Sequence, residues 1–278
     1  MTLPLFKSHY SIGRSILTLE EAETSKDNGP KSIIDICLEN DIKELFLVED
    51  GMSGFLQAYE NCGKSKIKLV FGIRMTFCND TKTKTTESIS EESKYIIFAK
   101  NTEGYRRLIK IYSEAATEGF YYIPRCDFEK LKKHWSNEDL MLCIPFYDSF
   151  LFKNLLGGNE CVTDFSFCEP VFFLEENNLP FDPLIRKYVD QFCESGHESI
   201  ETQTIYYEKK QDFKDYLTFR CLSKRTTLEK PNLDHMCSNE FCVESWKKNS
   251  IPRVRTVEKV KTQRQNTNNH EVIYDKKH

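Results

Sequence analysis

Two short segments of this 278-residue chain carry side chains that could bind a metal or a phosphate. Glu49 and Asp50 directly follow an apolar run that ends at Val48, and carboxylates at a strand end can ligate a cation. Such a pair also occurs in ordinary solvated turns, so both interpretations stay open. Residues 63–65 (Gly-Lys-Ser) have the form of the end of a phosphate-binding loop, but Ala58 stands where the first glycine is required. We therefore reject the phosphate-loop interpretation.

Histidine and cysteine residues offer a second kind of metal chemistry. His235, Cys237 and Cys242 are zinc-ligand types, with Cys221 as a fourth candidate. A structural zinc site usually presents two close ligand pairs, and this segment has only one, so the zinc interpretation has little support. The isolated histidines fit packing or solvent-facing positions better than catalytic ones; they are His9, His134 and His197.

The charge of the chain is unevenly distributed. Residues 247–278 carry nine Lys and Arg against three Asp and Glu, so this tail has a net charge of +6 and the total of −4 leaves −10 for the rest. Phosphate attraction needs clustered lysines and arginines. We therefore expect the acidic body to bind nucleic acid poorly and only the tail to make a weak contact with it.

The eleven cysteines do not indicate a disulfide framework. No apolar run of signal-peptide length opens the sequence, and no stretch approaches the length of a membrane span. In a reducing compartment, cysteines are mostly small buried hydrophobic residues. We therefore expect a cytoplasmic protein that is not associated with a membrane.

Seven apolar runs of strand type alternate with amphipathic helical patterns along the chain. This alternation predicts an α/β protein with a parallel sheet covered by helices. The sheet is either open or closed into a barrel, and periodicity does not decide between the two. The expected strands are residues 3–6, 45–48, 68–77, 95–99, 140–144, 171–174 and 200–207.

Capping residues mark the starts of several expected helices. Ser32, Thr102 and Asp127 are suitable N-caps, and Asp182-Pro183 combines an N-cap with a first-turn proline. The helix after Ser32 has one apolar face, formed by Ile33, Ile34, Cys37 and Leu38. The helix after Thr102 has an apolar stripe formed by Tyr105, Leu108, Ile109, Tyr112 and Ala116.

The segment that contains this last helix is distinctive in sequence. Residues 98–131 read FAKNTEGYRRLIKIYSEAATEGFYYIPRCDFEKL, which closely resembles the N-terminal polymerase-and-histidinol-phosphatase (PHP) domain of bacterial DNA polymerase III alpha subunits. The resemblance covers nearly everything up to Trp246. It implies a distorted, seven-stranded (β/α)7 barrel similar to a TIM barrel, with its site at the carboxyl ends of the strands. Other segments that resemble the same domain are residues 47–59, 67–74, 225–232 and 241–245.

Active members of that family bind up to three metal ions, which lower the pKa of a bound water and hold phosphate oxygens. Carried onto this chain, most of the ligand positions fall on residues that cannot serve. Only Glu49 and Asp50 keep oxygen ligands, and Arg74 brings a positive charge where a cation should sit. The former metal-ligand positions implied by the resemblance are Leu5, Lys7, Glu49, Asp50, Arg74, Phe146, Thr204 and Tyr206.

The resemblance therefore implies a degenerate metal site, and we expect no catalytic residue, no metal and no cofactor. Arg74 and Lys7 would fill the former metal space and pair with Glu49 or Asp50. A residual metal at Glu49 and Asp50 is the alternative, although a stable site usually has three or more protein ligands. We expect one shared barrel mouth for Lys7, Glu49, Arg74, Phe146 and Tyr206.

The implied role is that of a non-catalytic PHP-domain protein in DNA replication, because the family's polymerase palm has no counterpart here. It would be a scaffold or one component of a split polymerase, with a replicative DNA polymerase or a proofreading exonuclease subunit as partner. The alternatives are a metal-dependent phosphoesterase or 3'-5' exonuclease with a remodelled site, and a truncated remnant. We expect residues 1–246 to form the barrel domain, with residues 225–246 packed on it, and residues 247–278 to form a basic tail that is disordered alone.

Overall fold

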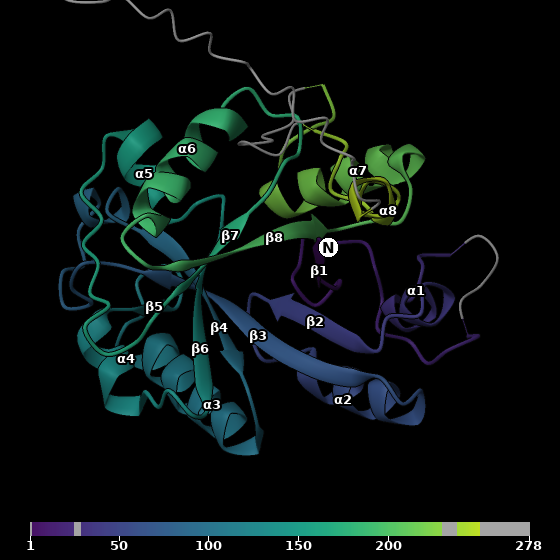
Figure 1. The fold of residues 1–278 in the computed structure, drawn as a ribbon, viewed down its shortest axis with the longest axis horizontal. Coiled ribbons are helices and arrows are strands. Elements are labelled where there is room, and N and C mark those ends of the chain that lie inside the picture. Colours follow the sequence, from purple (N-terminus) through teal and green to yellow (C-terminus); the bar gives the residue numbers. More distant parts are fainter. Residues whose placement is uncertain (1, 25–28, 230–237, 251–278) are drawn as a thin grey trace, which may run out of the picture.

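In this computed structural model, which describes residues 2–24, 29–229 and 238–250, seven of the described strands pair into a closed ring (Figure 1). Each of these strands is hydrogen-bonded to a neighbour on either side, so the sheet is a barrel rather than an open sheet. The predicted seven-stranded, TIM-like α/β barrel is confirmed. In order around the ring, its strands are β1 (Leu3–Phe6), β2 (Glu44–Glu49), β3 (Lys68–Phe77), β4 (Ser93–Ala99), β6 (Leu140–Ile144), β7 (Val171–Leu174) and β8 (Glu198–Ile205).

One strand of the ring, β4, runs in the opposite direction to the others. It pairs antiparallel with β3 and with β6, whereas the other pairs around the ring are parallel. The expectation of an all-parallel sheet is therefore wrong at β4. Between β3 and β4 the chain forms the one-turn helix η1 (Glu87–Ile89) and no long crossover helix. The strand β4 therefore starts at the end of the barrel where β3 finishes, and it runs back beside β3. A further short strand, β5 (Arg125–Cys126), pairs with the end of β3 outside the ring.

The inside of the barrel holds a small apolar cluster. Successive strand residues point to opposite faces, so every second residue of a strand points inward. Phe98 fills the interior beside Gly72, where a Cβ would lie 2.6 Å from the Phe98 ring. The buried members of this inner cluster are Leu5, Val48, Ile96, Phe98, Cys143, Val171 and Phe173.

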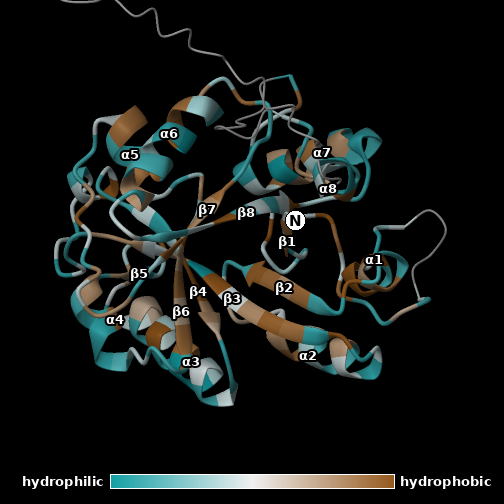
Figure 2. Ribbon diagram, viewed as in Figure 1, coloured by the Kyte–Doolittle hydropathy of each residue, from teal (hydrophilic) through white to brown (hydrophobic). Residues whose placement is uncertain are grey.

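Helices cover the outside of the barrel, and the main hydrophobic core lies between the two layers. Figure 2 shows apolar residues along the strands and polar residues on the outward sides of the helices. Leu47 and Ile97, which point outward from β2 and β4, belong to this main core. The helices are α1 (Ile33–Glu39), α2 (Phe55–Lys64), α3 (Thr102–Thr117), α4 (Phe128–His134), α5 (Phe150–Gly157), α6 (Asp182–Cys193), α7 (Phe213–Lys224) and α8 (Val243–Ser250), with η2 (Lys210–Asp212) before α7.

The predicted helix starts are correct to within one residue. Asn101, not Thr102, caps α3, because the Asn101 side chain accepts a backbone N–H of the first turn. The helix α6 begins at Asp182 itself, with Phe181 at the N-cap position. Two predicted caps accept backbone N–H groups as expected, Ser32 and Asp127.

The apolar faces of two helices differ from the prediction. Leu38 of α1 and Ile109 of α3 are 49% and 42% exposed. The neighbouring Ile36 and Ile111 occupy the core positions instead. Each helix is rotated relative to the predicted face, because each has apolar residues on two adjacent stripes and tertiary packing selects one of them.

Residues 238–250 pack on the barrel. Phe241, Val243 and Trp246 belong to the main core, and Trp246 Nε1 donates to the Thr2 carbonyl at 2.9 Å. The helix α8 continues past the predicted boundary at residue 246 and reaches Ser250. Most of the predicted tail, residues 251–278, lies outside the described residues.

Two further expectations can be compared with the described part of the chain. Its ten cysteines are all free thiols, and nine of them are buried, as expected for small apolar residues. Among the described helices, none is both long enough and apolar enough to span a membrane.

Candidate functional site at the barrel mouth

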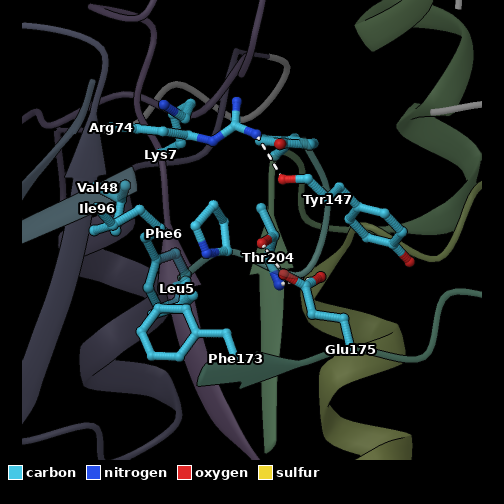
Figure 3. A pocket seen from close by; sticks show the side chains of 12 residues that line it. Leu5, Phe6, Lys7, Val48, Arg74, Ile96, Tyr147, Phe173, Glu175 and Thr204 are labelled. Atoms are coloured by element: carbon cyan, nitrogen blue, oxygen red, sulfur yellow. Dashed lines mark hydrogen bonds between the residues drawn. The ribbon is translucent and has the colours of Figure 1, made fainter. Parts of the chain in front are cut away.

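A small cavity opens at the carboxyl ends of the parallel strands (Figure 3). Its volume is about 30 Å³, which is room for one or a few water molecules. Figure 3 shows Lys7 and Arg74 on one side of the cavity and Leu5 and Phe173 from the inner apolar cluster on the other. The remaining lining side chains are Phe6, Val48, Ile96, Pro145, Tyr147, Glu175, Thr204 and Tyr206.

Lys7 directly follows β1 and brings an ammonium group into the mouth. Its side chain is 3% exposed, and its Nζ donates to Asp50 Oδ1 at 2.6 Å. Burial lowers the pKa of Lys7 more than the two neighbouring carboxylates raise it. Burial would raise the pKa of Asp50, but Lys7, Arg14 and Arg74 outweigh it and hold that pKa well below its ordinary value. Asp50 is therefore ionised at neutral pH and acts as the counter-ion of Lys7.

Glu49 points away from the cavity and fixes the loop after β1. Its carboxylate is 1% exposed, accepts the Ser8 backbone N–H at 2.9 Å, and accepts the Ser11 hydroxyl. The Ser11 oxygen accepts the Asp50 backbone N–H at 2.9 Å. Burial raises the pKa of Glu49, and Lys7 and the two serines act against this rise. Glu49 thus connects the ends of β1 and β2 instead of offering oxygens to the cavity.

Arg74 is the second cation of the mouth. Its Nη2 donates to Asp148 Oδ2 at 3.0 Å and to the Tyr147 carbonyl at 3.2 Å. Burial opposes its charge, but Asp148, Tyr206 and Asp50 together raise the pKa of Arg74. The expected pairing of a mouth cation with Asp50 is confirmed for Lys7, whereas Arg74 pairs with Asp148.

Lys94 of β4 adds a third cation near Arg74. The antiparallel register places Lys94 opposite Thr76, and its Nζ donates to the Thr76 hydroxyl rather than to a carboxylate. Burial, and then the charge of Arg74, lower the pKa of Lys94 to about 8. The mouth therefore concentrates positive charge on the β3 and β4 side.

Glu175, a buried carboxylate directly after β7, was not identified from the sequence. It is 4% exposed, and its Oε1 accepts the Thr204 hydroxyl at 2.6 Å. Its Oε2 accepts the Thr204 N–H at 3.2 Å and the Asn177 side chain at 2.9 Å. Burial raises the pKa of Glu175, and the bonds from Thr204 and Asn177 oppose the rise. The signal was present, since Glu175 follows a strand just as Glu49 and Asp50 do.

The predicted site residues fall into three groups. Five line the cavity: Leu5, Lys7, Arg74, Thr204 and Tyr206. Glu49 and Asp50 lie beside it, Asp50 through its bond to Lys7. Phe146 does not line it; it is 1% exposed within the main core, because Pro145 and Tyr147 are the residues that this segment directs to the cavity. The alternation after β6 thus places Phe146 on the opposite side of the chain.

These side chains do not fit a metal cluster of the kind that the resemblance implies. The Lys7 ammonium and the Arg74 guanidinium have no lone pair to donate. Asp50 is paired with Lys7, and both oxygens of Glu175 already accept hydrogen bonds. In the described residues, no group of three or more His, Cys, Asp or Glu is arranged to hold a metal ion. No reaction step through a metal follows from this geometry.

The isolated histidines contact neighbours outside the cavity lining. His134 Nε2 lies 2.8 Å from Glu114, and His197 stacks on Phe192 at a ring distance of 5.1 Å. His9 packs against Tyr10 at 4.5 Å. These contacts are those of packing and surface residues.

The zinc-ligand candidates can be located only in part. Cys221 and Cys242 are both buried thiols, and Cys242 contacts the Ser245 hydroxyl at 3.2 Å. His235 and Cys237 lie outside the described residues, so the zinc interpretation stays untested.

Comparison with known proteins finds a family match over part of the barrel. Residues 25–160 match the family model described as "PHP domain". Over these residues the chain is similar to PHP domains. This matched region includes Asp50 and Arg74, whereas Lys7 and Glu175 lie beyond its limits.

DNA polymerase III subunits alpha are among the curated proteins to which this chain is similar. The subunit from Aquifex aeolicus is 28% identical over 203 residues, covering 67% of this chain and 17% of that protein. The subunit from Treponema pallidum is 26% identical over 220 residues, covering 73% of this chain and 18% of that protein. The subunit from Chlamydia muridarum is 35% identical over 107 residues, covering 37% and 9%. The chain thus spans less than a fifth of the length of each of these relatives.

Proposed function

We propose that this PHP-domain protein is a non-catalytic component of DNA replication, acting as a scaffold or as one part of a split polymerase. The observation that carries the proposal is the placement of Lys7 and Arg74 in the barrel mouth, each held by a carboxylate. Two fixed cations occupy the position where a phosphoesterase of this fold would need metal ions and an activated water. The degenerate site is therefore built for stability and not for hydrolysis.

The ion pairs of the mouth act as structural links between strand ends. Lys7 and Asp50 connect the ends of β1 and β2, and Arg74 and Asp148 connect β3 to the segment after β6. A shared metal ion would join strand ends in the same way, because one ion takes ligands from several strands. Replacing metals by ion pairs keeps the mouth rigid without giving it a reactive centre.

The replication context rests on the relatives. Each relative reported above is a DNA polymerase III subunit alpha, and the similarity to two of them extends over two thirds or more of this chain. A replicative DNA polymerase or a proofreading exonuclease subunit is therefore the proposed partner. Residues 1–246 are the proposed barrel domain, although α8 carries its last helical turn to Ser250.

Binding measurements on the full chain and on a chain lacking residues 251–278 test this function. This truncation leaves α8 intact, because α8 ends at Ser250. The probes are the replicative polymerase and the proofreading exonuclease from the organism that encodes this chain, and a single-stranded DNA oligonucleotide. Each probe is titrated separately against the two forms of the chain. We expect one of the two proteins to bind both forms equally, and the DNA to bind weakly and only to the full chain. Binding of neither protein, or tight and salt-insensitive DNA binding by the truncated chain, would contradict the proposal.

A further inference from the structure

A row of side-chain amides joins the barrel mouth to helix α8. Glu175 lines the cavity and bonds to Thr204, which lines the same cavity (Figure 3). Gln203 precedes Thr204 in β8, and neighbouring strand residues point to opposite faces, so Gln203 points to the outside of the barrel, where α8 packs against β8. Asn177, in the loop after β7, contacts both Glu175 and Gln203. This loop therefore connects the inside of the mouth to the outside of the barrel.

Three hydrogen bonds form this row. Asn177 Nδ2 donates to Glu175 Oε2 at 2.9 Å, and Gln203 Nε2 donates to Asn177 Oδ1 at 2.6 Å. Asn249 Nδ2 of α8 donates to Gln203 Oε1 at 3.3 Å. Glu175, Asn177 and Gln203 are 4%, 0% and 1% exposed. We call these four residues the amide relay, and its three buried members have little contact with water.

The hydrogen bonds of the amide relay all run in one direction. Both oxygens of Glu175 accept hydrogen bonds, so the Asn177 amide turns its amino group toward them. The Asn177 oxygen then faces Gln203, and the Gln203 oxygen faces Asn249. Reversing any one of these amides would set two amino groups or two oxygens against each other in a buried place, which is costly. The orientation of the whole relay therefore depends on an acceptor oxygen at position 175.

Glu240 holds the same part of the chain through a second set of bonds. The Asn178 side chain donates to Glu240 Oε1 at 3.1 Å, and the Ser245 hydroxyl donates to Oε2 at 2.6 Å. Gln203 Nε2 also donates to the Glu240 carbonyl at 3.2 Å. The bonds of Asn178 and Ser245 do not pass through the amide relay, so they should keep the start of residues 238–250 in place when the relay is broken.

The end of α8 needs such contacts because the helix is short. It has eight residues, and isolated helices of this length are not stable in water. Val243 and Trp246 anchor its first half in the main core. Lys247 and Lys248 are exposed, and Asn249 in the last turn bonds to the relay. The last turn therefore relies on the amide relay more than the first turn does.

We infer that Glu175 holds the last turn of α8 on the barrel through the amide relay, so that the cavity at the mouth and α8 are coupled. The relay is a conformational device, because a change at the Glu175 oxygens alters how firmly α8 is held. Residues 251–278 continue directly from α8, so the relay connects the mouth to the attachment point of the basic segment. The inference does not depend on the scaffold function, since it concerns contacts within one chain.

Hydrogen–deuterium exchange of the full chain tests this coupling segment by segment. The amides of residues 246–250 report on α8, and those of β3 and β4 report on the barrel as a whole. Glu175→Met removes both acceptor oxygens, whereas Glu175→Gln keeps one. Gln203→Met breaks the relay at its centre and leaves the cavity-lining residues unchanged, so it also decides the matter if Glu175→Met does not fold. Glu201→Gln is the matched control, because Glu201 pairs with Arg186 outside the relay.

Glu175→Met and Gln203→Met should each speed exchange in residues 246–250 by roughly tenfold or more, because each leaves buried amide groups without partners. Exchange in β3 and β4 should stay as in the wild type, and Glu175→Gln and Glu201→Gln should stay close to the wild type throughout. The double variant should exchange no faster than the faster single variant, since either change already breaks the relay.

Three results would overturn the inference. The first is wild-type exchange of residues 246–250 in Gln203→Met. The second is faster exchange in α8 and in the barrel strands alike, which would indicate a general loss of stability. The third is equal acceleration by Glu175→Gln and Glu175→Met, because the relay requires only one acceptor oxygen toward Asn177. None of these results would bear on the scaffold function, which is tested by binding to the partner proteins.

Discussion

At the barrel mouth, each buried cation meets a particular oxygen. The Lys7 side chain is 3% exposed, and its partner Asp50 is 38% exposed. Losing the carboxylate should therefore cost more stability than losing the lysine, because Lys7 would remain a buried charge without this partner, whereas Asp50 can still contact water. This asymmetry makes the effects of single substitutions predictable.

Asp50→Asn should destabilise the protein by about 2 kcal/mol, because it removes the carboxylate that is hydrogen-bonded to the buried Lys7 ammonium. The effect stays below that of a fully buried pair, since Asp50 is partly exposed to water. Urea denaturation of wild type and variant measures it. Asp41→Asn is the control, because Asp41 and Lys43 form a salt bridge on the surface with both side chains mostly exposed. Adding Lys7→Met to Asp50→Asn should recover most of the loss; if it does not, Lys7 is not the source of the effect.

Lys94→Met should stabilise the protein by about 2 kcal/mol at pH 7, because the folded chain holds the Lys94 charge at a cost. The pKa of Lys94 falls from its ordinary value near 10.5 to about 8 in the folded protein. Between these two pH values the unfolded chain binds more protons at this site, so the stability of the wild type rises with pH there. The advantage of the variant should therefore shrink as pH rises from 8 to 10.5, and chemical denaturation across this range tests it. Lys100→Met, which removes a lysine at an exposed position, is the control substitution.

The candidate site was predictable where the family resemblance could be carried over residue by residue. The resemblance assigned Lys7 and Arg74 to former metal-ligand positions, and both line the cavity. Phe146 was assigned to the cavity, but a strand alternates its faces and a shift of one residue reverses them. Glu175 was missed although it follows a strand as Glu49 and Asp50 do, and its contact with Thr204, 29 residues later in the chain, is visible only in the fold.

Among the elements, β3 and β4 carry most of the departure from a regular parallel barrel. The antiparallel β4 sets Gly72 opposite Phe98, and the absent side chain lets the Phe98 ring enter the barrel. The packing of the inner apolar cluster below the mouth depends on the Phe98 ring filling the space that a side chain at position 72 would occupy.

Gly72→Ala should destabilise the protein by about 1–3 kcal/mol, because the new methyl group overlaps the Phe98 ring in a packed interior. Thermal or urea denaturation gives the value. Gly63→Ala is the control: Gly63 faces open space in α2, and alanine there should be neutral or slightly stabilising. Phe98→Leu in the Gly72→Ala background should recover part of the loss. An unchanged stability of Gly72→Ala would show that β3 and β4 are not in this register.

The elements themselves followed from sequence pattern with high accuracy. All seven barrel strands were located, because most of them are apolar or alternating runs bounded by polar or turn residues. Strand direction was not encoded in that pattern, since an apolar run reads the same for parallel and antiparallel pairing. The rotated faces of α1 and α3 have a related cause: packing against the barrel chose Ile36 and Ile111 over the equally apolar Leu38 and Ile109.

For the whole molecule, the barrel places two different surfaces at its two ends. The mouth holds the ion pairs of Lys7 and Arg74, and a groove lies between α2 and α3 near the start of β3 and the end of β4. Helix α8, the last described helix, packs Trp246 against the start of the chain.

The metal content and hydrolytic activity of the purified full chain test the central claim most directly. Elemental analysis and assays on p-nitrophenyl phosphate esters and on end-labelled single-stranded DNA would be run with added Mn²⁺ or Zn²⁺ and with chelator. Because Lys7 and Arg74 occupy the mouth as cations, the account predicts less than one metal ion per chain and no chelator-sensitive hydrolysis. Two or more ions per chain together with phosphoester hydrolysis that the chelator abolishes would contradict it.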